Sequence, residues 1–226
     1  MHIEPGVVDG AKIVLSYVTA AGAIGYAVKQ SLNTIRLDGV VPLAVRSVIA
    51  TVLVFSFFQV LPHYPIGVSE VHLILGATLF LMFGAGPAAI GLAAGLLAQG
   101  LFFVPADLPQ YGMNVTTLLV PLLAVSALAR RVIPADVAYK DLEYGQVFAL
   151  STAYQGGVIA WVAFWAFYGQ GFGAENLARV GSFGAAYMTV IIIEPLLDLA
   201  LLSAAKALHR LGDSKIFHAR LYRAAA

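Results

Sequence analysis

The first two residues, Met1 and His2, offer the most distinctive chemistry in the sequence. The free α-amine of Met1, the backbone nitrogen of His2 and the His2 imidazole can wrap one metal ion in two adjoining chelate rings. Such a donor set is nearly planar, and planar nitrogen ligation favours Ni(II) or Cu(II), with Co(II) next in the order of affinities. A fourth nitrogen would close the square, for which His72 is the best candidate and His63 the second. The pattern predicts a site that releases protons on binding and that any residue placed before Met1 destroys.

Three polar residues could hold a ligand imidazole in its orientation by a hydrogen bond. They are Ser69, Gln99 and Asn114, which fall near the same side of the predicted membrane spans as His2. Ordinary hydrogen bonds between helices explain these side chains equally well.

Two carboxylates, Glu194 and Asp198, lie four residues apart in an apolar stretch and therefore on one helix face. Within a membrane they could form a proton relay or a site for a hard cation. A structural role against Tyr or Gln partners, with at least one carboxyl protonated, is the other interpretation. An autonomous proton-coupled cation transporter using this pair is therefore an alternative function, although no inverted repeat is apparent. A metalloenzyme is a third hypothesis, but planar four-nitrogen ligation leaves no open position for water.

The elements that must position these residues are membrane helices. Of the 226 residues, 60% are hydrophobic and 11% charged, against about 25% charged in a soluble domain. The net charge of +1 supplies no field that would hold nucleic acid. The absence of cysteine excludes disulfides, thiolate metal sites and a thiol nucleophile. Acidic residues and a proline near the start argue against a cleaved signal peptide.

Seven apolar stretches are candidates for crossing about 30 Å of hydrocarbon, which takes about 20 residues of helix. They are residues 11–28, 43–61, 71–83, 87–104, 115–128, 145–168 and 182–205, of which the third and fifth are short. Residues 84–87 (GAGP) break what would otherwise be one long helix. The sequence therefore predicts an all-α membrane protein of about seven transmembrane helices.

The basic residues indicate the direction of these spans. They gather at 29–46, 130–140 and 206–223, and these groups share one side only if the chain breaks at 84–87. The positive-inside rule then places the N-terminus outside and the C-terminus in the cytoplasm. We expect residues 1–205 to form a single helical membrane domain and residues 206–226 a basic cytoplasmic tail. The tail could contact anionic lipid or a partner, or serve as a topology anchor.

Several segments together resemble one known family. They are residues 1–6 (MHIEPG), 67–76 (GVSEVHLILG), 99–103 (QGLFF) and 112–114 (GMN), and the similarity extends from residue 1 to about residue 205. These segments are similar to the CbiM/NikM family, the substrate-binding membrane components of energy-coupling-factor transporters for cobalt and nickel. The opening Met-His-Ile with a following glycine is the most specific part of the resemblance.

The resemblance implies a multi-pass protein of the cytoplasmic (inner) membrane whose inserted N-terminal segment binds Co(II) or Ni(II) from outside. It implies ligation by the Met1 amine, the His2 amide and imidazole, and His72, with no organic cofactor. The implied partners are a transmembrane coupling subunit, ATPase subunits and a small accessory membrane subunit. Ala23 and Ala27 could face the coupling subunit, with internal packing as the alternative. Since the chain carries no ATPase motif, hydrolysis is expected from the partners and no enzymatic activity from this chain.

Overall fold

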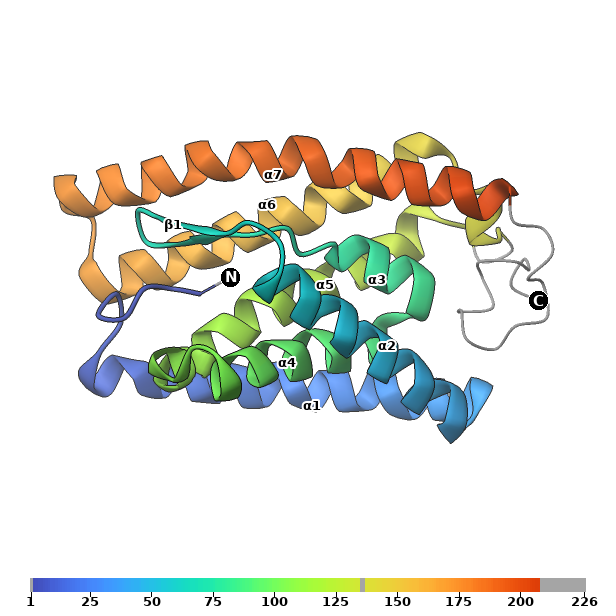
Figure 1. The fold of residues 1–226 in the computed structure, drawn as a ribbon, viewed down its shortest axis with the longest axis horizontal. Helices are drawn as coiled ribbons and strands as arrows, with labels where there is room; N and C mark the ends of the chain where they lie inside the picture. Colours follow the sequence, from blue (N-terminus) through green and yellow to red (C-terminus); the bar gives the residue numbers. More distant parts are fainter. Residues whose placement is uncertain (1, 135–136, 208–226) are drawn as a thin grey trace.

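The computed structural model describes residues 2–134 and 137–207 of the chain. In this part the chain forms an elongated helical bundle with one small β-hairpin (Figure 1). The α-helices are α1 (Ile13–Asp38), α2 (Val40–Gln59), α3 (Gly76–Phe83), α4 (Ala85–Phe102), α5 (Tyr111–Val132), α6 (Tyr144–Gln170) and α7 (Ala174–Ala207). The hairpin consists of β1 (Tyr64–Ile66) and β2 (Ser69–Val71), and short 3₁₀ helices are η1 (Gly10–Lys12), η2 (Pro105–Gln110) and η3 (Tyr139–Asp141).

Within the described residues, six helices are long and apolar enough to cross a membrane: α1, α2, α4, α5, α6 and α7. Their outward faces are apolar as well; α2, for example, exposes Val40, Val41, Val48 and Val52. Exposed apolar side chains in such number suit lipid better than water. The prediction of an all-α membrane architecture is confirmed in this coarse form. The sequence places the end of the first span at residue 28, whereas α1 continues to Asp38.

The third predicted span, residues 71–83, is not a transmembrane helix. Its helical part, α3, has only 8 residues and is therefore about 12 Å long. Upstream of α3 the chain is the extended strand β2, and Leu75 has the left-handed φ of 55° just before the helix begins. The backbone N–H of Ile74 donates to the Glu194 carboxylate of α7 instead of to a helical carbonyl. The segment predicted to be the third span is thus a hairpin strand, a short extended segment and a two-turn helix.

The helix break predicted at residues 84–87 is confirmed. Gly84, with a φ of 89°, separates α3 from α4. As a result the α3–α4 junction, the start of α2 and the C-terminal end of α7 lie at one end of the bundle (Figure 1). Two basic residues at that end make contacts within the chain. Arg46 forms an ion pair with Asp38, and Lys206 donates a hydrogen bond to the Leu142 carbonyl at 3.0 Å.

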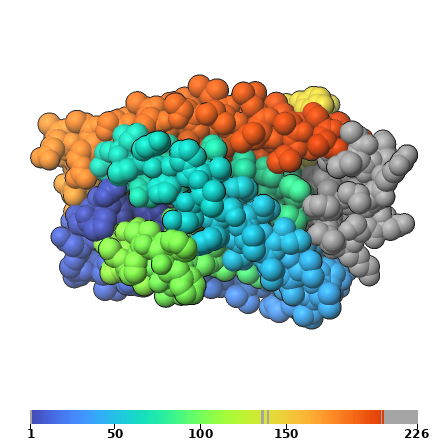
Figure 2. All heavy atoms as spheres, viewed as in Figure 1, coloured from blue at the N-terminus to red at the C-terminus, as the bar shows by residue number. Residues whose placement is uncertain are grey.

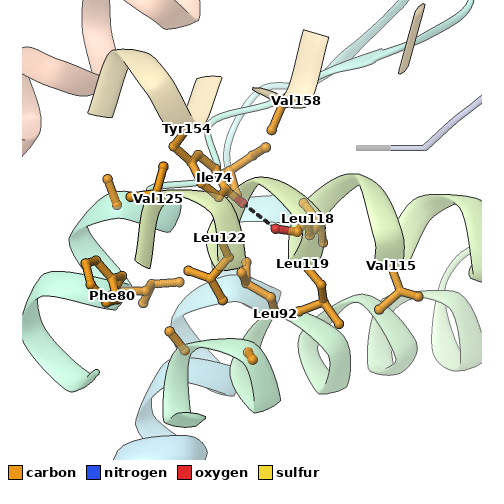
Figure 3. Packing of buried hydrophobic residues seen from close by; sticks show 14 of the residues in the cluster. Ile74, Phe80, Leu92, Val115, Leu118, Leu119, Leu122, Val125, Tyr154 and Val158 are labelled. Atoms are coloured by element: carbon orange, nitrogen blue, oxygen red, sulfur yellow. Dashed lines mark hydrogen bonds between the residues drawn. The ribbon is translucent and has the colours of Figure 1, made fainter. Parts of the chain in front are cut away.

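A compact apolar layer lies where α3, α4, α5 and α6 meet (Figure 3). Ile74 packs there against Tyr154, whose hydroxyl donates to the Leu118 carbonyl at 3.4 Å. A Cβ on Gly76 would lie 2.1 Å from the Tyr154 ring, so only glycine lets the ring cover this turn. This layer anchors the chain immediately after His72.

Candidate metal centre

The N-terminal segment turns back into the bundle and is held there by backbone pairing. Ile3 forms an antiparallel bridge with Ser69 of β2. On either side of it, the Glu70 N–H donates to the His2 carbonyl at 2.9 Å and the Glu4 N–H to the Val68 carbonyl at 3.1 Å. Figure 2 shows this segment between the hairpin and the residues that follow α4. The pairing carries His2 into the interior, where it is 4% exposed.

Gln99 of α4 determines which nitrogen of the His2 ring carries the proton. The Gln99 side-chain N–H₂ donates to the Phe58 carbonyl at 3.2 Å, so its Oε1 is the atom that faces His2. Oε1 lies 2.7 Å from His2 Nε2 and can only accept a hydrogen bond. Nε2 must therefore be the protonated nitrogen of the neutral ring, which leaves the lone pair on Nδ1.

His2 Nδ1 is the ring nitrogen that a chelate with the His2 backbone nitrogen would use. It lies 2.8 Å from Oδ2 of Asp107. That approach does not have the geometry of a hydrogen bond, and Nδ1 has no hydrogen-bond partner among the described residues. A buried lone pair without a donor is a candidate metal ligand.

His72 lies next to His2, between β2 and α3, and is 1% exposed. The two ring centroids are 5.6 Å apart. Nε2 of His72 lies 2.8 Å from Oε2 of Glu70, while Nδ1 has no hydrogen-bond partner in the described part of the chain. Burial, and secondarily the charges that His2 and His63 can carry, lower the pKa of His72 well below its ordinary value. The ring is therefore neutral at pH 7 and able to bind a metal ion.

His63 is placed less favourably than His72. Its ring stacks on His72 with centroids 5.1 Å apart, and its Nδ1 lies 3.1 Å from the Leu61 carbonyl. It is partly exposed, whereas the His72 ring on which it stacks is buried. Met1 falls outside the described residues.

The other predicted polar residues all reach the N-terminal segment, but in different ways. Gln99 alone contacts the imidazole. Ser69 donates to the His2 carbonyl at 2.9 Å, and Asn114 Oδ1 accepts the Ile3 N–H at 2.8 Å. Ser69 and Asn114 thus hold the backbone of the segment and so fix where the His2 ring can lie.

Two carboxylates of the site were missed in the sequence analysis. His2, Glu70 and His72 can each offer one ligand atom, and these atoms lie within 4.8 Å of one another. Glu70 precedes His72 by two residues, and the alternation of side chains along a strand could have placed both on one face. Asp107 carries no such signal, since the fold alone brings it to His2. Burial and the charges of Glu70 and Asp107 raise the pKa of the nearby Glu4, which indicates an acidic surrounding.

Glu194 does not approach the histidines. Its carboxylate accepts hydrogen bonds from the Ile74 backbone and from the Gln155 side chain. Gln155 in turn accepts a hydrogen bond from the Tyr187 hydroxyl at 2.7 Å. Asp198 is also buried and faces Ser151. The surroundings of Glu194 therefore agree with the structural interpretation of this carboxylate: Gln155 contacts it directly, and Tyr187 contacts Gln155.

Ala23 and Ala27 lie on the inward face of α1, each 7% exposed. Their methyl groups pack inside the chain, which agrees with internal packing and not with contact to a coupling subunit. Other small residues of α1, Ala21, Gly22 and Gly25, lie on its exposed face.

A scan against protein-family models finds a match over residues 2–210. The model is CbiM, described as the cobalt uptake substrate-specific transmembrane region. No curated protein and no solved structure matches the chain. The matched range includes His2, His72, Gln99 and Asp107.

Proposed function

The chain belongs to the CbiM family, the substrate-specific transmembrane component of cobalt uptake, and we propose that it captures its ion through an N-terminal chelate closed by His72. The observation that carries this proposal is the buried Nδ1 of His2, which has no hydrogen-bond partner among the described residues. The donors are the Met1 amine, the His2 backbone nitrogen, His2 Nδ1 and one ring nitrogen of His72. His63 is the second candidate for the last position.

The surroundings of the site support capture of a divalent cation. Glu4, Glu70 and Asp107 place negative charge around the two rings, which attracts a cation from solution. The chelate also needs a neutral Met1 amine and a deprotonated His2 amide, so binding releases protons. Co(II) is the substrate that the family description names, and Ni(II) fits the same nitrogen donors.

The site faces the outer side in this proposal. The basic end of the bundle, with Arg46 and Lys206, then faces the cytoplasm, in keeping with the positive-inside rule. Residues 1–205 act as one membrane domain and residues 206–226 as a basic tail. The membrane is the cytoplasmic (inner) membrane.

Release of the ion into the cell requires partners in this proposal. A transmembrane coupling subunit and ATPase subunits of an energy-coupling-factor transporter supply the energy, together with a small accessory membrane subunit. Ala23 and Ala27 face the interior, so contact with the coupling subunit along α1 begins at the exposed Ala21, Gly22 and Gly25. No organic cofactor takes part.

The proposal is tested by blocking the N-terminal amine. Protein with a native Met1 and protein carrying a short cleavable extension before Met1 are titrated with Co(II) and Ni(II). We expect the extension to weaken binding at least 100-fold and proteolytic removal back to Met1 to restore it. Equal affinities for the native and the extended protein would exclude the chelate.

The proton-coupled alternative makes the opposite prediction about transport. Both oxygens of Glu194 are engaged by Ile74 and Gln155, so this carboxylate is poorly placed to relay protons. We expect no Co(II) accumulation in proteoliposomes that contain this chain alone. Accumulation without ATPase partners, lost in Glu194→Gln and Asp198→Asn, would support the alternative instead.

A further inference from the structure

Asp107 lies opposite the free nitrogen of His2 although no part of the proposed chelate requires it. It belongs to η2, between α4 and α5, and its side chain is 11% exposed. Its Oδ2 lies 2.8 Å from His2 Nδ1. A pocket beside the two side chains is bordered by Tyr111 and Asn114.

This contact is not explained by a hydrogen bond. In the neutral ring Gln99 accepts the proton at Nε2, so Nδ1 presents a lone pair to the carboxylate. The contact also lacks hydrogen-bond geometry. Two lone-pair atoms at this distance in a buried setting repel one another unless a cation lies between them.

The distance suits two ligands of one metal ion. First-row divalent ions such as zinc bind imidazole nitrogen and carboxylate oxygen at about 2.0–2.2 Å. Two such ligands at a right angle are about 2.9 Å apart. The observed 2.8 Å between Nδ1 and Oδ2 is therefore the spacing of cis ligands.

We propose that Asp107 is an oxygen ligand of the transported ion, bound cis to His2 Nδ1. This inference deepens the proposed function and rests on it, because the ion must first be held by the N-terminal chelate. The carboxylate offsets charge on the bound ion and adds a hard donor to an otherwise nitrogen-rich set. Because planar Ni(II) is satisfied by four nitrogens, loss of Asp107 weakens Co(II) binding more than Ni(II) binding.

The test compares variants of the full-length chain with a native Met1, loaded with Co(II) or Ni(II). Asp107→Asn and Asp107→Ala both remove the carboxylate. Both are measured, so that the test can still be made with one variant if the other fails to fold. Asp9→Asn is the matched control, because it removes the charge of an exposed carboxylate in the same N-terminal segment, and this side chain does not cap the helix that follows it. The readouts are affinity, the visible ligand-field bands of Co(II), and metal–ligand distances from X-ray absorption.

We expect both Asp107 variants to lose at least tenfold in Co(II) affinity, to lose less in Ni(II) affinity and to shift the Co(II) bands. Asp9→Asn should change affinity by less than threefold and leave the bands in place. Unchanged bands in both Asp107 variants would overturn the proposal even if affinity falls, since a residue that only positions His2 does not alter the ligand set. If the wild type binds no better than its N-terminally extended form, it is the chelate itself that fails.

Discussion

Replacing Gln99 with leucine tests how the protein prepares His2 for a metal ion. The Gln99 Oε1 that accepts the Nε2 proton at 2.7 Å is lost, and the ring is too buried, at 4% exposed, for water to replace it. The side chains are similar in size, so packing is largely kept. The favoured tautomer then carries its proton on Nδ1, next to Asp107. A metal ion would have to displace that proton before it could bind.

The size of the effect follows from the lost hydrogen bond. Leaving a buried N–H without a partner costs about 1–3 kcal/mol. Since 1.4 kcal/mol corresponds to about a tenfold change in an equilibrium constant, the binding tautomer becomes about 5- to 150-fold less populated. Residues that orient a metal-bound imidazole contribute about 10–100-fold to affinity in other proteins. We therefore expect the Kd of Gln99→Leu for Co(II) to rise about 10–100-fold.

The measurement is a competition titration against a coloured chelator, with purified protein that begins at Met1. Thr117→Val is the control, because it removes a buried hydrogen bond to the Met113 carbonyl of α5 and leaves His2 untouched. Gln99→Glu retains an acceptor for Nε2 and should keep more affinity than Gln99→Leu. If Gln99→Leu binds within threefold of the wild type, the tautomer argument is wrong.

Three further predictions concern the chain around His72. His72→Ala should weaken Co(II) binding far more than His63→Ala, because His72 is buried beside His2 whereas His63 is partly exposed. Metal titration measures both affinities, and the reverse order would identify His63 as the fourth ligand. Gly67→Ala should lower thermal stability by about 1–3 kcal/mol, since φ is +68° and a Cβ would lie 2.1 Å from the Arg179 carbonyl; Gly184→Ala, which meets open space, should have little effect. Finally, the metal-free protein should lose stability as the pH falls below about 6.5, because unfolded His72 takes up a proton that the folded ring, with its lowered pKa, does not. Thermal unfolding at about pH 7.5 and about pH 5.5 should show this slope, and His72→Gln should flatten it.

The helices of the bundle were largely predictable because their signals are local. Length and hydropathy identify the six long helices, and the glycines and proline of residues 84–87 mark the α3–α4 break. The ends were less predictable. The first span was expected to end at residue 28, near Lys29, yet α1 continues to Asp38. A charged residue marks where lipid ends, whereas a helix continues for as long as its backbone hydrogen bonds are made.

The candidate site was predictable only in part. Met1-His2 is a local pattern, and the expectation that His72 joins it depends on both lying at one end of the spans. Asp107 could not be found in this way, because nothing in the spacing of residues 105–111 points to His2. Its contact with the ring depends on how η2 packs beside the inserted N-terminal segment, which is a tertiary property.

The prediction of a helical span at residues 71–83 was wrong for a physical reason that also accounts for Glu194. A helix at residues 71–75 would satisfy its own backbone, but it would forgo the strand pairing that β2 makes with Ile3. An extended chain inside a membrane bundle must obtain its hydrogen bonds from other parts of the protein. β1 and the N-terminal segment supply them for β2, and the Glu194 carboxylate supplies one for Ile74. A carboxylate deep in α7 is therefore needed where the chain leaves the helical pattern beside His72, and its presence requires no proton transport.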